Sequence, residues 1–254
     1  MTRAEPPFPA VGATPRWGLG DVALAWLMAQ AVSVAVILAT LGLRGADGRG
    51  LAAALAGAVD GETYSRFDAA GLLAMLAQQI PLWSTMAAAF VWVVWVRGAD
   101  PGTELGVSAR AGDLGLGFAS GIGAQLAVGV LYALLGLVVD LNVDEPARRL
   151  AAKGTGLGVV VLFVAFAFVA PVLEELFYRS LLLSALARRL PSSGALVVSA
   201  LVFAAVHFQA VQFPGLLLAG LAFGWLFQRR GLGAAIAAHV GFNAASLLFV
   251  VASR

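Results

Sequence analysis

Seven long apolar stretches, separated by short polar segments, constrain the fold of this chain more than any other feature. They run approximately over residues 20–43, 69–96, 113–139, 157–187, 194–209, 213–228 and 233–252. A helix needs about 20 residues to cross the roughly 30 Å hydrocarbon core of a bilayer. Lipid offers the backbone no hydrogen-bond partners, so a single apolar segment crosses it as a helix, in which the backbone groups bond to one another. The pattern predicts an all-α, polytopic transmembrane helix bundle with seven or eight spans.

The choice between seven and eight spans depends on Pro171, which lies inside the longest apolar stretch. Proline removes a backbone donor and clashes with the preceding turn, so we expect the 157–187 helix to bend or break there. A break would create the eighth span. Proline is also favoured in a first helical turn. A helix starting at Pro171 would place Glu174 and Glu175 in its positively polarised N-terminal turns.

The composition supports a chain whose surface mostly faces lipid. It is 61% hydrophobic and only 12% charged, whereas soluble domains are nearer half apolar and a quarter charged. The chain has no cysteine, which excludes disulfides, thiolate zinc sites and a cysteine nucleophile. The net charge of +2 is too small and too scattered for nucleic-acid binding. We therefore expect membrane lipid as a partner, and no nucleic acid.

The chain divides into three parts. Residues 1–17 are polar and proline-rich and predict a flexible N-terminal tail. Residues 18–112 contain N-terminal transmembrane helices, and residues 113–254 form a transmembrane core, which the motifs described below, within 155–250, predict to be catalytic. The excess of Ala, Gly and Arg is typical of a GC-rich bacterial genome, which favours the bacterial cytoplasmic membrane as the location.

Arginines in short loops predict the orientation. The dipeptides Arg188-Arg189 and Arg229-Arg230 lie in the two shortest basic connections. Basic residues in short loops favour the cytoplasmic side of a membrane. An even number of spans separates the two dipeptides, so both are predicted to be cytoplasmic, and so is the N-terminus.

Ionisable side chains inside the apolar stretches are the strongest functional signal. Each costs roughly 2.5–3.5 kcal/mol at the middle of a membrane, so it persists where it is partnered or functional. The C-terminal half contains both histidines of the chain and three motifs. These are Glu174-Glu175-Leu176-Phe177-Tyr178-Arg179, Phe203-Ala204-Ala205-Val206-His207 and His239-Val240-Gly241-Phe242-Asn243.

Helical spacing relates the charged residues of the first motif. Glu175 and Arg179 are four residues apart, so they share a helix face and can form an ion pair. Glu174 is rotated by about 100° from Glu175 and has no local partner. The spacing therefore leaves Glu174 as the free carboxylate.

The other two motifs bring polar groups together in the same way. Phe203 and His207 are four residues apart, so the phenyl ring can pack beside the imidazole, and His239 and Asn243 project together. A carboxylate with an imidazole can deprotonate water, and an imidazole with a carboxamide can hydrogen-bond an oxyanion. These groups are the parts of a hydrolytic site that needs no serine or cysteine nucleophile.

The three motifs, in this order on separate helices, resemble those of the CPBP family of CAAX proteases and bacteriocin-processing enzymes, also called the Abi family. The resemblance covers about residues 155–250. It implies an α-helical intramembrane endopeptidase, now usually described as glutamic-type. By this resemblance Glu174 and His207 activate water, His239 and Asn243 form the oxyanion hole, and Glu175 and Arg179 support them, with Phe203 as the aromatic residue of the second motif.

Zinc is the alternative to a metal-free site. Glu174, His207 and His239 could supply three ligands. Zinc-bound histidines usually have a second-shell acceptor on the other ring nitrogen, and the apolar sequence neighbours of both histidines supply none. We therefore expect the metal-free route and no cofactor.

Two other functions use similar residues. A proton-coupled transporter would also hold Glu, His and Arg inside the membrane, but no inverted repeat is visible and the polar groups cluster in one half. The second alternative is a non-catalytic immunity or scaffold protein with the same motifs.

Overall fold

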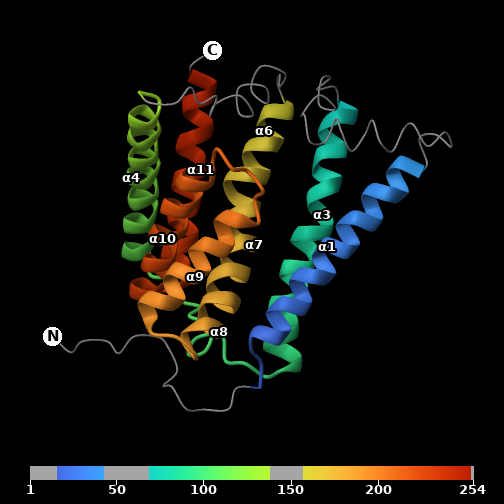
Figure 1. Cartoon of the computed structure of the whole chain (residues 1–254), viewed down its shortest axis with the longest axis vertical. Coiled ribbons are helices and arrows are strands. Elements are labelled where there is room, and N and C mark those ends of the chain that lie inside the picture. Colours follow the sequence, from blue (N-terminus) through green and yellow to red (C-terminus); the bar gives the residue numbers. More distant parts are fainter. Residues whose placement is uncertain (1–15, 43–68, 138–156, 253–254) are drawn as a thin grey trace.

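The computed structural model describes residues 16–42, 69–137 and 157–252, and all of its regular elements are helical (Figure 1). The all-α class is therefore confirmed over these ranges. The elements are α1 (Leu19–Gly42), α3 (Ala69–Val91) continued by η2 (Trp92–Val96), α4 (Ala111–Leu135), α6 (Leu157–Val164), η3 (Ala165–Val169), α7 (Ala170–Glu175), η4 (Leu176–Leu183), α8 (Ser184–Ala187), α9 (Ser192–Ala205), α10 (Phe213–Arg230) and α11 (Leu232–Ala252), where η marks π-helix.

Four stretches within these helices are long and apolar enough to cross a membrane. They are Leu19–Val36, Gln79–Val96, Ala111–Leu135 and Leu232–Phe249. Leucine, valine and tryptophan side chains cover the exposed surface of these helices, as expected where lipid replaces water. The chain is an integral membrane protein.

The helix through Pro171 neither breaks nor restarts. Leu157 to Ala187 is one uninterrupted run of α- and π-helix, and the backbone at Val169, Ala170 and Leu176 is right-handed helical. A π-helical stretch directly precedes the proline. It changes the hydrogen-bond register, which is a common way to accommodate an irregularity inside a helix. The predicted break, the eighth span that it would create and the position of the glutamates at a helix start are therefore wrong, and the alternative of a bend at Pro171 stays a prediction.

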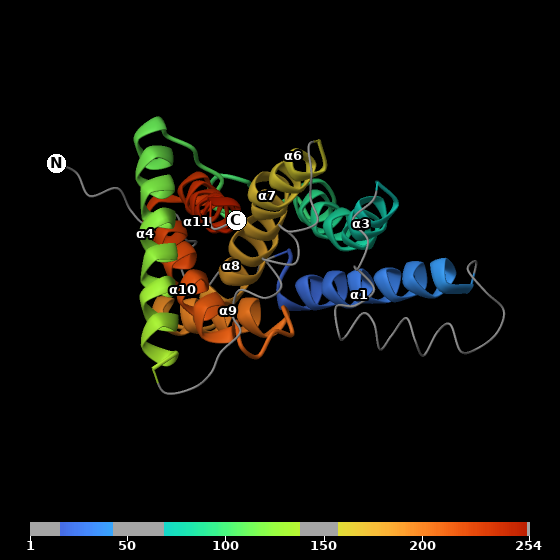
Figure 2. The same ribbon diagram turned by 90° about the horizontal axis from the view of Figure 1, so that it is seen from above.

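This long rod, α6 to α8, stands between two groups of helices (Figure 2). The α1–α3 pair lies on one side, and α4, α10 and α11 lie on the other. α7 contacts both α3 and α11, and η4 contacts α9. The rod therefore carries the first motif through the centre of the bundle.

Glycines allow α4 and α11 to pack backbone to backbone. A Cβ added at Gly117 or Gly121 would overlap the carbonyl oxygens of Ala234 and Ala238. Small residues permit this close approach in membrane bundles. The pair Gly117 and Gly121 therefore explains the most extensive helix–helix contact in the described part of the chain.

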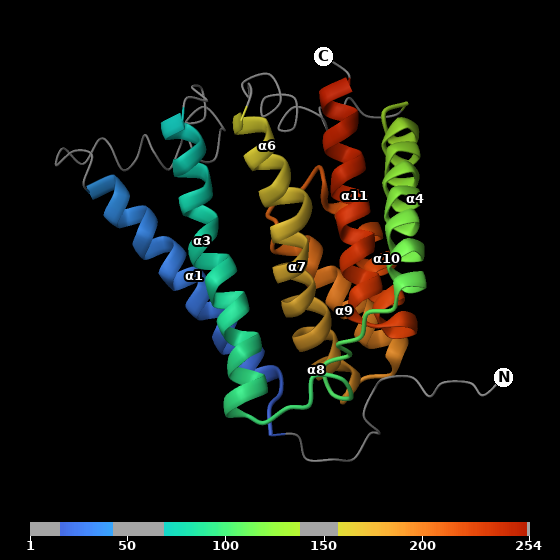
Figure 3. The same ribbon diagram turned by 180° about the vertical axis from the view of Figure 1, so that it is seen from behind.

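The connection between α9 and α10 lies inside the length of the bundle. In Figures 1 and 3 it stops short of the outer ends of α6 and α11. α9 ends at Ala205, four residues before the predicted end of the 194–209 helix. Phe208 has a positive φ of 53°, which ends a right-handed helix. The apolar composition continues through this turn, so hydrophobicity did not reveal the exit, and His207 lies just beyond the helix.

Three ion pairs gather at the end of the bundle where α1, α4, α9 and α11 begin. They are Arg97–Asp21 at 2.7 Å, Arg188–Glu104 at 2.9 Å and Arg230–Asp113 at 2.9 Å. Trp17 is buried there and donates from Nε1 to Glu104. Trp17 is thus packed, although it is the last residue of the predicted flexible tail. Residues 1–15 of that tail lie outside the described ranges.

Candidate active site

Glu175 lies at the centre of a polar cluster and links two motifs. Its side chain has no exposed surface. One carboxylate oxygen, Oε2, lies 2.9 Å from Arg179 Nε, and the other, Oε1, lies 2.9 Å from His239 Nδ1. The predicted ion pair with Arg179 is therefore confirmed. The bond to His239 joins the α6–α8 rod to α11 and could not be inferred from spacing within one helix.

Arg179 is fully buried as well. Its Nε is within ion-pair distance of Glu175 without the alignment of a hydrogen bond, and its Nη1 and Nη2 atoms have no hydrogen-bond partner in the described ranges. The guanidinium lies over two rings, 4.8 Å from the Phe203 centroid and 5.8 Å from the Phe223 centroid. Aromatic faces attract a cation in such positions, so the charge is held by one carboxylate and two rings.

His239 is oriented from both sides. Its side chain is 5% exposed, and its ring stacks on Phe223 at a centroid distance of 4.6 Å and an interplanar angle of 23°. An ionised carboxylate only accepts hydrogen bonds, so His239 Nδ1 donates to Glu175. The other nitrogen, Nε2, is left facing Glu174. Sequence reasoning missed Phe223, which lies in the predicted apolar stretch 213–228.

Glu174 and His239 face one another without touching. The distance between Glu174 Oε2 and His239 Nε2 is 3.9 Å, which is too long for a direct hydrogen bond. A water about 2.8 Å from each atom can bond to both at once. Glu174 is slightly more open than its neighbour Glu175, with a side-chain exposure of 17%. This pair has the geometry of a carboxylate and an imidazole that share one water.

His207 approaches the same cluster from the α9–α10 turn. Its Nδ1 lies 2.6 Å from the carbonyl oxygen of Phe203. A carbonyl only accepts, so Nδ1 carries the proton and Nε2 keeps its lone pair. The Phe203 ring lies 4.8 Å from the His207 ring and 5.9 Å from the His239 ring. The predicted packing of Phe203 beside His207 is confirmed, and Phe203 also contacts the second imidazole.

Asn243 lies one turn beyond His239 and donates from Nδ2 to the carbonyl oxygen of Phe166 at 2.8 Å. Phe166 belongs to η3, where the N–H of Ala170 bonds to the carbonyl five residues earlier. In that register the next donor would be Pro171, which has no N–H. The Asn243 amide therefore supplies a hydrogen bond that the proline cannot. Its second N–H remains available for another acceptor.

The surroundings of the histidines overturn one reason for excluding zinc. Glu175 accepts from His239 Nδ1, and the Phe203 carbonyl accepts from His207 Nδ1. Both imidazoles thus have the second-shell acceptors that the sequence neighbours lacked, because one acceptor comes from another helix and one from the backbone. Within the described ranges, no group of three or more His, Cys, Asp or Glu residues is arranged to hold a metal ion.

Comparison with known proteins identifies the segment that carries this site. Residues 156–245 match the family model described as Type II CAAX prenyl endopeptidase Rce1-like. No curated protein and no solved structure matches the chain. The matched segment runs from the start of α6 into α11 and contains all three motifs. This match to the Rce1-like family model agrees with the family that the motif resemblance predicted for this segment.

Proposed function

We propose that this protein is a glutamic-type intramembrane endopeptidase that hydrolyses a peptide bond in a membrane-associated protein or peptide. The observation that carries the proposal is the 3.9 Å approach of Glu174 Oε2 to His239 Nε2 inside a family-matched helical segment. Glu175 holds His239 in the orientation that this approach requires. The family description supports an endopeptidase, and the substrate and the residue roles are our proposal.

In this mechanism Glu174 and His207 activate the water. Glu174 accepts a proton from the water while the water oxygen attacks the carbonyl carbon of the scissile bond. The oxyanion that forms is stabilised by His239 Nε2 and by the second N–H of Asn243. The C–N bond then breaks, and the proton passes to the leaving amine. The products are a carboxylate and an amine, so the atoms of one water are fully accounted for.

The Glu175–Arg179 pair has a positioning role in this scheme. A His239 that donates from Nε2 while Nδ1 also donates carries a positive charge. The Glu175 carboxylate at Nδ1 stabilises that charge, much as a carboxylate stabilises the imidazolium of a catalytic triad. Arg179 in turn holds the Glu175 carboxylate in place through the ion pair between them. The residues present supply a base and oxyanion donors, so we propose a site that works without a metal or other cofactor.

The helix lengths lead us to revise the number of spans. α9 has 14 residues and α10 has 18, or about 21 and 27 Å at 1.5 Å per residue, against about 30 Å for the hydrocarbon core. We propose that these two helices form a hairpin inserted from the arginine-rich end, while the five other rods cross. The arginine-rich end is then cytoplasmic by the positive-inside rule, in a bacterial cytoplasmic membrane.

Replacing the Glu174 carboxylate with a carboxamide of the same shape tests the proposal. Glu174→Gln keeps the shape of the side chain and removes the base, so cleavage of a reconstituted transmembrane peptide should fall by at least about 10²-fold. Glu104→Gln, at the arginine-rich end of the bundle and away from the motifs, is the control and should retain activity. The assay uses purified full-length protein in lipid vesicles, a chelator of tightly bound zinc and mass spectrometry of the products. Undiminished cleavage by the Glu174→Gln variant, or loss of wild-type activity on chelation with recovery on zinc addition, would contradict this mechanism.

A further inference from the structure

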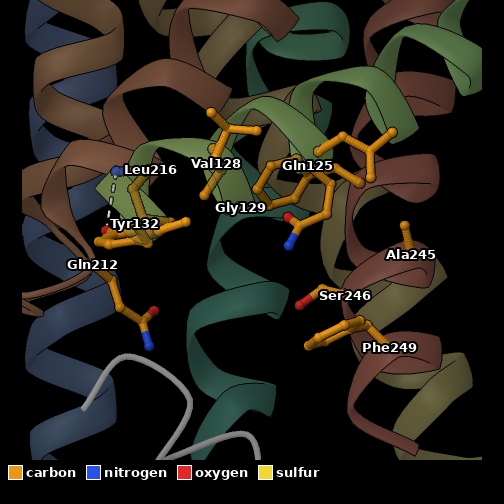
Figure 4. Close-up of a pocket in the computed structure, with 14 residues that line it drawn as sticks. Gln125, Val128, Gly129, Tyr132, Gln212, Leu216, Ala245, Ser246 and Phe249 are labelled. Carbon is orange, nitrogen blue, oxygen red and sulfur yellow. Dashed lines mark hydrogen bonds between the residues drawn. The ribbon is translucent and has the colours of Figure 1, made fainter. Parts of the chain in front are cut away.

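A pocket of about 900 Å³ lies between α4 and α11, beside the α9–α10 turn. It is formed by α4, the start of α10, the turn before it, and the outer half of α11 (Figure 4). Leu126 and Val130 at its edge are 67% and 59% exposed, so the pocket opens sideways from the bundle. In an integral membrane protein, that opening faces lipid.

Uncharged polar groups from three elements enter this mostly apolar pocket. Gln125 comes from α4, Gln212 from the turn, and Ser246 from α11, and Figure 4 shows all three directed into it. The Oε1 atom of Gln125 is buried and has no hydrogen-bond partner in the described ranges. Among the residues that the structure describes, no charged side chain lines the pocket. The pocket could not be predicted from the sequence, because it assembles residues from distant parts of the chain.

Tyr132 shapes the inner wall. Its hydroxyl donates to the carbonyl oxygen of Val211 at 2.8 Å and accepts from the backbone N–H of Gly215 at 3.2 Å. These bonds fix the α9–α10 turn against α4. A Cβ at Gly215 would overlap the tyrosine ring, so the glycine permits this closure. The wall is therefore built by specific contacts and its own polar atoms are satisfied, unlike Gln125.

We propose that this pocket binds an extended, uncharged segment of the peptide substrate, next to the scissile bond. An unwound peptide in a membrane needs hydrogen-bond partners for its N–H and C=O groups. The amides of Gln125 and Gln212 and the hydroxyl of Ser246 offer both donors and acceptors. A hydrocarbon chain would fill the same volume but leave Gln125 Oε1 unpaired, which is unfavourable in a buried site. The polar groups thus favour a peptide over a lipid tail.

The pocket adjoins the proposed active site, and this inference rests on the proposed function. Phe242 lines the pocket and touches the Phe223 ring at a centroid distance of 5.7 Å. Phe223 in turn stacks on His239. Two rings therefore separate the pocket from the imidazole, so the pocket holds residues flanking the scissile bond and leaves the bond itself to Glu174 and His239.

A single cysteine introduced into the pocket can report whether the pocket is occupied, because the chain has no other thiol that could react. The Ser246→Cys protein in lipid vesicles is alkylated by a membrane-permeant maleimide. The probes are a capped hexapeptide of alternating leucine and alanine, its backbone N-methylated analogue and the isoprenoid alcohol farnesol. The capped peptide should slow alkylation at lower concentration than its analogue by about 2- to 10-fold, the range for loss of one hydrogen bond. Gln125→Leu should remove this difference, whereas Gln79→Leu on α3 should preserve it.

The outcomes separate this proposal from the proposed function. Glu174→Gln should abolish cleavage and leave peptide protection intact, so protection without hydrolysis still supports the pocket as a peptide site. The proposal is overturned if the two peptides protect equally, if neither protects, or if farnesol alone protects. The last result would make the pocket a lipid-tail site.

Discussion

At the scale of single residues, the buried charges of Glu175 and Arg179 depend on one another. Neither side chain has any exposed surface. Removing one member of a buried ion pair leaves an uncompensated charge, whereas an exposed pair contributes little. Glu175 has a second partner in His239, but Arg179 has only aromatic rings besides Glu175 within the described ranges. The two residues should therefore differ in their sensitivity to loss of the partner.

We predict this asymmetry in the free energy of unfolding. Glu175→Gln leaves the guanidinium without an anion and should cost about 3–5 kcal/mol. Arg179→Met should cost less, because His239 still pairs with the carboxylate. The double variant should be close to Arg179→Met rather than to the sum of both changes. Thermal unfolding in detergent provides the measurement.

The Arg97–Asp21 pair at the end of the bundle is more exposed than the buried pair and provides a control for this cycle. Asp21→Asn removes the partner of Arg97, whose side chain is 44% exposed, and should cost less than about 1 kcal/mol. If the losses of unfolding free energy for Glu175→Gln and Arg179→Met add up in the double variant, the buried pair is not coupled as described. The same conclusion follows if Asp21→Asn lowers the free energy of unfolding as much as Glu175→Gln does.

Sequence reasoning succeeded where partners lie on one helix and failed where they lie on different elements. The four-residue spacing identified the Glu175–Arg179 pair and the packing of Phe203 on His207. It could not identify the bond from His239 to Glu175, because helix orientation is needed to bring them together. The contact of Asn243 with the backbone of Phe166 was hidden for a further reason, since it depends on a π-helical register that side-chain patterns do not encode.

At the scale of elements, the contact between α4 and α11 depends on the absence of side chains. Gly121 faces the backbone of Ala238, and Gly117 faces Ala234. The sequence shows that Gly117 and Gly121 are four residues apart but does not name the partner helix. The sequence also did not predict that the helix continues through Pro171. Proline usually ends a helix, but here a π-helical stretch precedes it and the helix stays continuous.

We predict opposite effects for two alanine substitutions on α4. Gly121→Ala forces α4 and α11 apart and should lower the free energy of unfolding by about 1–3 kcal/mol. Gly123→Ala meets nothing within 4 Å and should be neutral or stabilising by up to about 1 kcal/mol, because alanine is the better helix former. Thermal unfolding of the two proteins in the same detergent compares them. Equal stability of the two would mean that the helices do not pack this closely.

At the scale of the whole molecule, the positions of the arginines relate the bundle to the membrane. Arg97, Arg188 and Arg230 lie at one end and form ion pairs that tie neighbouring helices together there. The predicted orientation placed Arg188 and Arg230 on one side of the membrane, and the structure places them at a common end of the bundle. The longer connections, 43–68 and 138–156, lie outside the described residues.

This arrangement predicts the labelling of single thiols from the two sides of the membrane. Ser108→Cys and Ser192→Cys should react with an impermeant maleimide from the same side, which we expect to be cytoplasmic. Gly136→Cys, at the other end of α4, should react from the opposite side. Labelling of intact cells and inverted vesicles distinguishes these outcomes. Reaction of Ser108→Cys and Ser192→Cys from different sides would rule out the described bundle.

In the proposed mechanism, water held by Glu174 and His239 attacks a peptide bond directly. Cleavage of a reconstituted transmembrane peptide in ¹⁸O-labelled water, with hydroxylamine present, tests it by mass spectrometry of the new C-terminus. We predict incorporation of ¹⁸O from the solvent, no hydroxamate, and no product from the Glu174→Gln variant. A hydroxamate would reveal a covalent acyl-enzyme, and unchanged products from the Glu174→Gln variant would show that this carboxylate is not the base; either result would contradict the mechanism.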